Sequence, residues 1–225
     1  MITSSVILLS AGVGRRLKKN YPKGLLKLNN KPLFCYSLET FNLSNIFTTT
    51  CIVVPRGYED KFKKYIKKYQ LHVDLIVTGG RYRVDSMING FCSLNNCDYV
   101  FIHDCARPFV SRKLILRLWE AVKKYKAVIP VRHISFTVKK CLLGFVDSTI
   151  DRRDLYEVQT PQVFSYSILK SAIEDYLTFK DKPVICDDSF LVELAGKRVK
   201  TVEGDVFNFK ITYPQDLELA KKLIL

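Results

Sequence analysis

The sequence lacks any apolar run near the ~20 residues that a membrane-spanning helix needs, so no transmembrane segment is expected. It also lacks a basic segment and a small-residue cleavage site around its first apolar stretch, so residues 6–9 are interpreted as a strand and not as a signal peptide. No CxxC pair occurs, and the seven cysteines are odd in number. This argues against a disulfide framework or a zinc site and favours buried free thiols in a reducing cytosol.

Acidic residues are few, since 22 Asp and Glu stand against 36 Lys and Arg, for a formal net charge of +14. Such a chain attracts polyanions. Charge alone does not separate nucleic acid, an anionic membrane and a phosphorylated small molecule. No helix-turn-helix, zinc-finger or RRM signature is present, so a nucleic-acid-binding protein is a remote alternative. The lysine-rich residues 61–68 are interpreted as a solvated helix face.

Hydrophobic residues make up 48% and charged residues 26% of the 225 positions, an ordinary globular balance for one domain over 1–225. Short apolar runs alternate with segments of helical period. Strands are expected at residues 6–9, 50–54, 73–77, 99–102, 127–131 and 199–203. Helices are expected at residues 33–41, 58–69, 84–94, 111–124, 165–176 and 187–194, and from Pro214 onward. This alternation predicts an α/β fold: a three-layer, Rossmann-like, mostly parallel sheet with helices on both faces.

Residues 132–159 break this alternation, because they hold short β-like pieces and no long helix. We expect a protruding β-arm there. A surface hairpin within one subunit and an exchanged arm at a dimer interface both fit the pattern. In parallel sheets, ligands bind beyond the carboxyl ends of the strands. Chemistry-bearing motifs should therefore follow strands.

The first such motif, residues 10–16 (SAGVGRR), directly follows the first strand. Two glycines after a strand let backbone N–H groups close around a phosphate chain. The motif is not a Walker loop, and Leu17 occupies the third glycine position of a dinucleotide fingerprint. Arg16 and Lys23 are placed to point at one triphosphate. A tight turn with solvated arginines is the alternative.

The second motif, residues 79–86 (GGRYRVDS), lies between a strand and a helix. Its glycines permit close backbone approach, and Ser86 with nearby N–H groups is placed to contact a base edge. Capping of the helix by Arg83 or Asp85 is the alternative.

The third motif, residues 103–108 (HDCARP), follows the strand at 99–102. An acidic residue there, Asp104, suits a magnesium contact, and Arg107 suits a second phosphate. His103 is expected to be a structural, hydrogen-bonding residue and not a general base. If a phosphate oxygen is the nucleophile, it is already ionised and needs little help from a base. Residues 149–152, 159–162 and 208–212 carry weaker signals.

These stretches, with residues 186–196 and 202–217, resemble in order and spacing the 2-C-methyl-D-erythritol 4-phosphate cytidylyltransferase family. The resemblance covers residues 6–220. It implies a single nucleotidyltransferase domain that transfers CMP from CTP to methylerythritol phosphate and releases pyrophosphate, in non-mevalonate isoprenoid biosynthesis. It further implies Mg²⁺ as cofactor and a homodimer formed through the arm at about 132–159. No nucleic-acid or membrane partner is expected, for the reasons given above. The expected compartment is the cytoplasm, or a plastid-type stroma if the chain is a processed form.

The resemblance also implies residue roles. The catalytic pair, which neutralises charge on the α-phosphorus, is Arg16 and Lys23. The CTP-binding residues are Ser10, Ala11, Gly12, Gly14, Gly80, Arg81, Arg83, Ser86, Cys105 and Lys210. The acceptor-binding residues are Asp104, which also lies by the metal, Arg107, Thr137, Arg152 and Thr160. By analogy, Thr137, Arg152 and Thr160 act in the neighbouring subunit's site.

The chain departs from the family pattern at several positions. Gly24 stands where Gln is usual, Arg81 where an acid is usual and Cys105 where alanine is usual. Residues 132–137 disrupt the usual Pro-Val-x-Asp-Thr pattern and lack its aspartate. These changes affect the acceptor side more than the phosphate chemistry. A cytidylyltransferase for ribitol 5-phosphate or another alditol phosphate is therefore the nearest alternative, although residues 149–152 look more like the methylerythritol enzymes.

Overall fold

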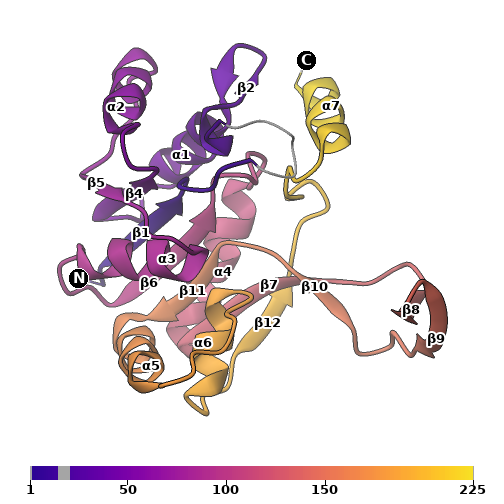
Figure 1. The fold of residues 1–225 in the computed structure, drawn as a ribbon. Helices are drawn as coiled ribbons and strands as arrows, with labels where there is room; N and C mark the ends of the chain where they lie inside the picture. The colour runs from indigo at the N-terminus through magenta and orange to yellow at the C-terminus, as the bar shows by residue number, and fades with distance from the viewer. Residues whose placement is uncertain (1, 15–20, 225) are drawn as a thin grey trace.

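The computed structural model describes residues 2–14 and 21–224, and within them eight strands form one central sheet. Four neighbouring strands at one side of this sheet run parallel, in the order β6-β1-β4-β5 (Figure 1). They are β1 (Ser4–Leu9), β4 (Thr49–Val54), β5 (Leu75–Thr78) and β6 (Tyr99–Asp104). The predicted parallel βαβ arrangement is confirmed for this part of the chain.

The other side of the sheet has mixed strand directions. β11 (Gln162–Ser165) lies antiparallel between β6 and β7 (Ala127–His133). β7 also pairs in parallel with β12 (Lys200–Glu203), and its last residues pair antiparallel with β10 (Tyr156–Val158). Strand β11 was not predicted, since residues 162–165 are too few to show a period.

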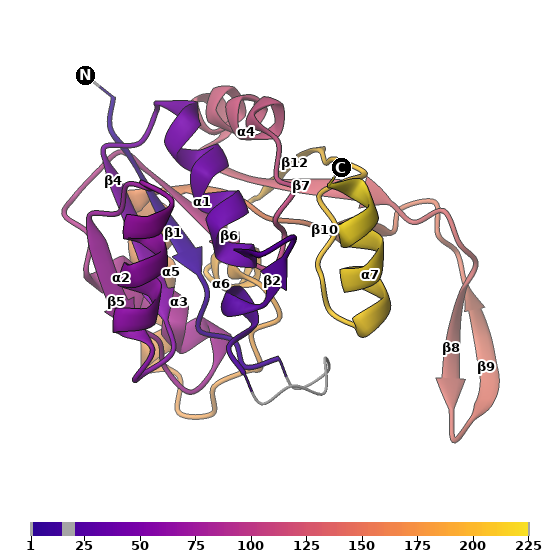
Figure 2. The same ribbon diagram turned by 90° about the horizontal axis from the view of Figure 1, so that it is seen from above.

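Helices cover both faces of the sheet (Figure 2). One face packs against α1 (Leu33–Ser44), α2 (Glu59–Lys68) and α4 (Arg112–Tyr125). The opposite face packs against α3 (Arg83–Cys92), α5 (Tyr166–Thr178) and α6 (Asp188–Leu194). The last helix, α7 (Pro214–Leu223), lies beside the short β2 (Lys27–Leu28) and β3 (Lys31–Pro32). The three-layer prediction is confirmed.

The alternation of side chains along β1 explains why both faces need helices. Val6 and Leu8 belong to one buried cluster, whereas Ile7 and Leu9 belong to the other. Because successive strand residues point to opposite faces, a wholly apolar strand must be covered on both sides. Because the four strands are parallel, their carboxyl ends all lie at the same edge of the sheet.

Capping residues set the starts of several helices. The Ser111 Oγ accepts a hydrogen bond from Leu114 N at 3.1 Å, which confirms the predicted cap of α4. The Asp187 carboxylate accepts from Phe190 N at 3.0 Å and begins α6. Pro214 occupies the first turn of α7, as expected.

The predicted arm is present and projects from the sheet (Figure 1). Its distal part is a hairpin of β8 (Val138–Leu142) and β9 (Phe145–Ile150), separate from the central sheet. The connecting Leu143 and Gly144 have φ values of 48° and 86°, which suits a two-residue hairpin turn. The base of the arm is the antiparallel pairing of β7 with β10.

The described part of the chain holds no helix with the length and apolar character required to cross a bilayer. All seven cysteines are free thiols. Cys35, Cys51 and Cys105 are buried as expected. The prediction of burial is wrong for three others, which are exposed: Cys92, Cys141 and Cys186.

Candidate active site

A cavity of about 710 Å³ opens at the carboxyl ends of β1 and β6, where the sequence predicted the site. All three strand-following motifs contribute to it, together with the segments around Lys23 and Lys210. Its lining includes Ser10, Ala11, Gly12, Gly14, Lys23, Gly24, Gly80, Arg81, Arg83, Ser86, Asp104, Cys105 and Lys210. Every predicted CTP-binding residue is therefore brought to one cavity. Arg16, half of the predicted catalytic pair, lies outside the described residues.

The glycine loop is fixed to the segment that carries Lys23. The Lys23 N–H donates to the Gly12 carbonyl at 3.0 Å, and Val13 pairs with Pro22 in an antiparallel bridge. On the other side of the loop, Ser10 N donates to the Val53 carbonyl at 2.8 Å. These bonds hold the backbone of residue 23 against the loop.

The second glycine motif packs directly on the first. A Cβ at Gly79 would lie 2.4 Å from the Ala11 Cβ, so only glycine allows this approach. The Ser86 hydroxyl accepts from Gly80 N at 3.1 Å and lies 3.1 Å from the Tyr82 carbonyl, to which it donates. Ser86 thus holds the loop as well as lining the cavity. The sequence left open whether Arg83 or Asp85 caps the following helix. Asp85 does so, since its carboxylate accepts from Tyr82 N at 2.9 Å.

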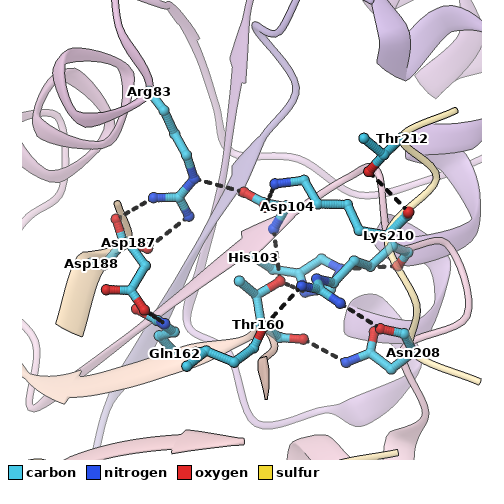
Figure 3. A network of polar contacts seen from close by, with 12 residues as sticks. Arg83, His103, Asp104, Thr160, Gln162, Asp187, Asp188, Asn208, Lys210 and Thr212 are labelled. Carbon is cyan, nitrogen blue, oxygen red and sulfur yellow. Dashed lines mark hydrogen bonds and ion pairs between the residues drawn. The ribbon is translucent and has the colours of Figure 1, made fainter. Parts of the chain in front are cut away.

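Arg83 instead joins two carboxylates (Figure 3). Its Nη1 and Nη2 donate to Asp188 at 2.7 and 2.8 Å, and its Nε donates to Asp104 Oδ1 at 3.0 Å. The other oxygen of Asp104 accepts from Lys210 Nζ at 2.5 Å. The chain of ion pairs therefore runs from α6 through Arg83 and Asp104 to Lys210.

Burial and charge oppose each other along this chain of ion pairs. Burial disfavours the ionised form of Asp104, but Arg83 and Lys210 outweigh it and hold its pKa well below the usual range. At Asp188, which is fully buried, burial outweighs the attraction of Arg83 and raises the pKa. Asp104 therefore stays ionised at the cavity. Asp188 holds the Arg83 guanidinium through two hydrogen bonds.

His103 and Thr160 support the Asp104 backbone. The His103 Nε2 lies 3.1 Å from the Arg107 carbonyl, which only accepts, so Nε2 carries the proton. Nδ1 then accepts from the Thr160 hydroxyl at 3.0 Å, and Thr160 Oγ1 in turn accepts from Asp104 N at 3.1 Å. The prediction of a structural His103 is confirmed. Burial lowers its pKa to about 3.

We expect His103 to make the protein less stable in mild acid. The unfolded chain binds a proton below a pKa of about 6.5, whereas the folded chain does not until about 3. The free energy of unfolding therefore decreases as the pH drops, and this group alone accounts for about 2 kcal/mol of the decrease between about pH 7 and about pH 5. Urea unfolding of the wild type and His103→Gln at both pH values measures it, with surface His72→Gln as control. Equal pH dependence in wild type and His103→Gln would contradict the expectation.

The acceptor residues predicted by resemblance do not all reach the cavity. Thr160 lies beneath Asp104 of its own chain, because β11 returns the chain to the sheet, so its expected place in a neighbour's site is wrong. Arg107 donates to the carbonyls of Asn208 and Val158 at 2.7 and 3.1 Å and is not among the lining residues. Thr137 and Arg152 lie in the exposed arm, where Arg152 donates to the Ser135 carbonyl.

Two supporting residues received no role from the sequence. Asp188 directly follows the helix-capping Asp187, and its burial is visible only in the fold. Asn208 is also fully buried, and its Nδ2 donates to the Thr160 carbonyl at 2.7 Å. The stretch 208–212 that it begins was noted only as a weaker signal.

The described residues form no metal cage of their own. Within residues 2–14 and 21–224, no three His, Cys, Asp or Glu side chains gather into a cluster that could hold a metal. Mg²⁺ is usually held by one or two carboxylates together with substrate phosphates and waters. Both oxygens of Asp104 are engaged by Arg83 and Lys210. A metal contact of Asp104 would therefore require one of these pairings to open, and it stays a prediction.

Comparison with known proteins gives a consistent result. The family model described as 2-C-methyl-D-erythritol 4-phosphate cytidylyltransferase matches residues 4–225. The enzyme of that name from Clostridioides difficile is 36% identical over 222 residues, covering 98% of this chain and 93% of the relative. The one from Geobacillus kaustophilus is 36% identical over 220 residues, covering 97% and 95%.

Solved structures agree with these relatives. The crystal structure of 4-diphosphocytidyl-2C-methyl-D-erythritol synthase from Anaerococcus prevotii superposes with a TM-score of 0.85 at 29% identity, covering 99% of this chain and 98% of that one. That of 2-C-methyl-D-erythritol 4-phosphate cytidylyltransferase from Thermus thermophilus has a TM-score of 0.83 at 29% identity, with the same coverage.

Proposed function

The chain belongs to the 2-C-methyl-D-erythritol 4-phosphate cytidylyltransferase family, and from this we propose that it transfers CMP from CTP to 2-C-methyl-D-erythritol 4-phosphate in isoprenoid biosynthesis. The observation that carries the proposal is the cavity itself. Two glycine motifs pack against each other there, and Lys23, Arg83 and Lys210 all line the same space. Backbone N–H groups and clustered cations are the groups that bind a triphosphate.

The proposed reaction is an in-line displacement. An oxygen of the acceptor's phosphate attacks the α-phosphorus of CTP, a new P–O bond forms, and the bond to pyrophosphate breaks. The nucleophile is already an anion, so positioning and charge neutralisation supply most of the catalysis. Lys23 beside the glycine loop is suited to neutralise the α-phosphorus, and Arg16 is proposed as its partner from the sequence alone.

Two further features stay proposals. Mg²⁺ is proposed to arrive with CTP, because both oxygens of Asp104 are already paired. The cytoplasm is the proposed compartment, which the seven free thiols support, since such thiols persist in a reducing environment.

The arm is proposed to form a homodimer. It exposes large apolar side chains that a monomer would leave in water, led by Leu143 at 90%, Phe136 at 81% and Phe145 at 80%. Exposed apolar groups gathered on one projecting element indicate a protein interface. In that dimer, Thr137 and Arg152 on the arm would reach the partner's acceptor site, whereas Thr160 stays beneath Asp104 of its own chain.

Replacing Phe145 by Glu should therefore weaken the dimer and lower turnover at least tenfold, because a charge would be buried at the interface. Light scattering after size exclusion gives the mass, and pyrophosphate release gives the rate. Leu43→Glu is the matched control, since Leu43 is 64% exposed at the end of α1, away from the arm. A fully active wild-type monomer would overturn the proposed dimer.

The function is tested by pyrophosphate release from CTP and Mg²⁺, with methylerythritol 4-phosphate and ribitol 5-phosphate as separate acceptors. We expect release with the first only. Release with ribitol 5-phosphate only would keep the CTP site and move the enzyme to polyol metabolism. A folded protein that is silent with both, and that binds duplex DNA with a steep salt dependence, would overturn the proposal in favour of nucleic-acid binding.

A further inference from the structure

An unusually close contact joins Ser10, at the end of β1, to Gly24, just after Lys23. A Cβ built on Gly24 would lie 1.8 Å from the Ser10 Oγ and 3.2 Å from the Ser10 Cβ. The first distance is impossible for real atoms, and the second is tighter than ordinary van der Waals contact. Rotation of the hydroxyl would relieve only the first. A side chain at residue 24 therefore needs this rotation and, in addition, a shift of a few tenths of an ångström between the two segments.

The space around this contact is already filled. Ser10 is only 3% exposed, and its hydroxyl has no hydrogen-bond partner of normal geometry among the residues that the structure describes. It lies against the buried Cys105 thiol. Two departures from the family pattern, Gly24 and Cys105, thus meet at the Ser10 side chain. Ser10 and Cys105 occupy volume that a larger residue at 24 would need.

The segment that carries Gly24 is anchored on both sides. On one side, Lys23 N donates to the Gly12 carbonyl at 3.0 Å. On the other side, Leu25 is buried in the core, and Leu26 N donates to the Lys23 carbonyl at 3.1 Å. A side chain at residue 24 would therefore strain this turn against the glycine loop and shift Lys23, its direct neighbour in the chain.

We infer that Gly24 is a positioning residue for Lys23: its missing side chain lets the turn sit on Ser10 at the distance that places Lys23 beside the glycine loop. The inference rests on the proposed function, because it assigns Lys23 to the reacting phosphate. Lys23 would act on charge that develops in the transition state. Its displacement should then lower kcat much more than it raises KM for CTP.

The test is a double-mutant cycle of Gly24→Ala, Ser10→Gly and the double variant Ser10→Gly/Gly24→Ala. A shift of about 1 Å at a catalytic group costs on the order of a hundredfold, and a shift of part of that should cost less. We therefore expect kcat of Gly24→Ala to fall by roughly tenfold, with KM for CTP within about twofold of wild type. The double variant removes both clashing atoms, so its kcat should lie within about threefold of that of Ser10→Gly alone, which accounts for any loss of the predicted CTP contact of Ser10.

Gly90→Ala in α3 is the matched control. Its Cβ would lie 2.7 Å from Ile7 Cγ2, a comparable clash in the core and away from the lining. It should lower the melting temperature without a selective loss of kcat. The inference is overturned by a Gly24→Ala variant with wild-type kcat, or by a double variant that is slower than Ser10→Gly by the same factor as Gly24→Ala is slower than wild type. If Gly24→Ala does not fold, the double variant decides, since a kcat within about threefold of Ser10→Gly supports the inference and a lower kcat overturns it. Inactive wild-type enzyme would instead contradict the proposed function.

Discussion

Replacing Lys23 by alanine is expected to lower kcat by on the order of a hundredfold or more, as for the loss of one preorganised charge contact. Lys23 lines the cavity, and its backbone is hydrogen-bonded to Gly12 of the glycine loop. Two anions must meet in the proposed reaction, so a missing positive charge raises the barrier directly. Because the contact strengthens as charge develops on the α-phosphorus, KM for CTP should change much less than kcat.

Initial rates of pyrophosphate release across CTP concentrations measure this effect. Lys27→Ala is the matched control, because Lys27 is exposed on β2, four positions along the chain, and is absent from the lining. A near-normal kcat in folded Lys23→Ala would remove Lys23 from the mechanism. It would also remove the basis for assigning a positioning role to Gly24.

The second large effect is on stability, and it concerns Arg83. Its replacement by methionine leaves the fully buried Asp188 without its two hydrogen bonds, and Asp104 without one. Loss of one partner of a buried pair is strongly destabilising, and we expect the free energy of unfolding to fall by about 3 kcal/mol. This is the lower end of the usual range, because 28% of the Arg83 side chain is exposed. Urea unfolding measures it.

A second variant separates packing from charge. Arg83→Met/Asp188→Leu removes both partners, and apolar replacement of a whole buried pair is often close to neutral. It should regain most of the lost stability but not the activity, because Asp104 still lacks the Arg83 contact. A single variant that loses less than about 1 kcal/mol would show that Asp188 is stable without Arg83.

Patterns within short stretches could be predicted from the sequence. The apolar run of β1 and the capping Ser111 carry their meaning in neighbouring residues, and both were placed correctly. The three motifs that follow strands were also brought to one edge, because parallel strands direct their carboxyl ends the same way.

Contacts between distant parts of the chain could not be predicted in this way. Arg83 and Asp188 are 105 positions apart, and nothing in either local pattern identifies the other. Thr160 was assigned to a neighbouring subunit by analogy with the family. Its position depends on strand β11, which is too short to show a period and runs against the parallel strands beside it.

The ion pair between Lys210 and Asp104 gives the cavity a counterion of its own, since the two charged groups lie 2.5 Å apart. For the proposed triphosphate, binding at Lys210 would be an exchange of one anion for another. Part of the attraction expected from a net charge of +14 would then be offset by the loss of the contact with Asp104.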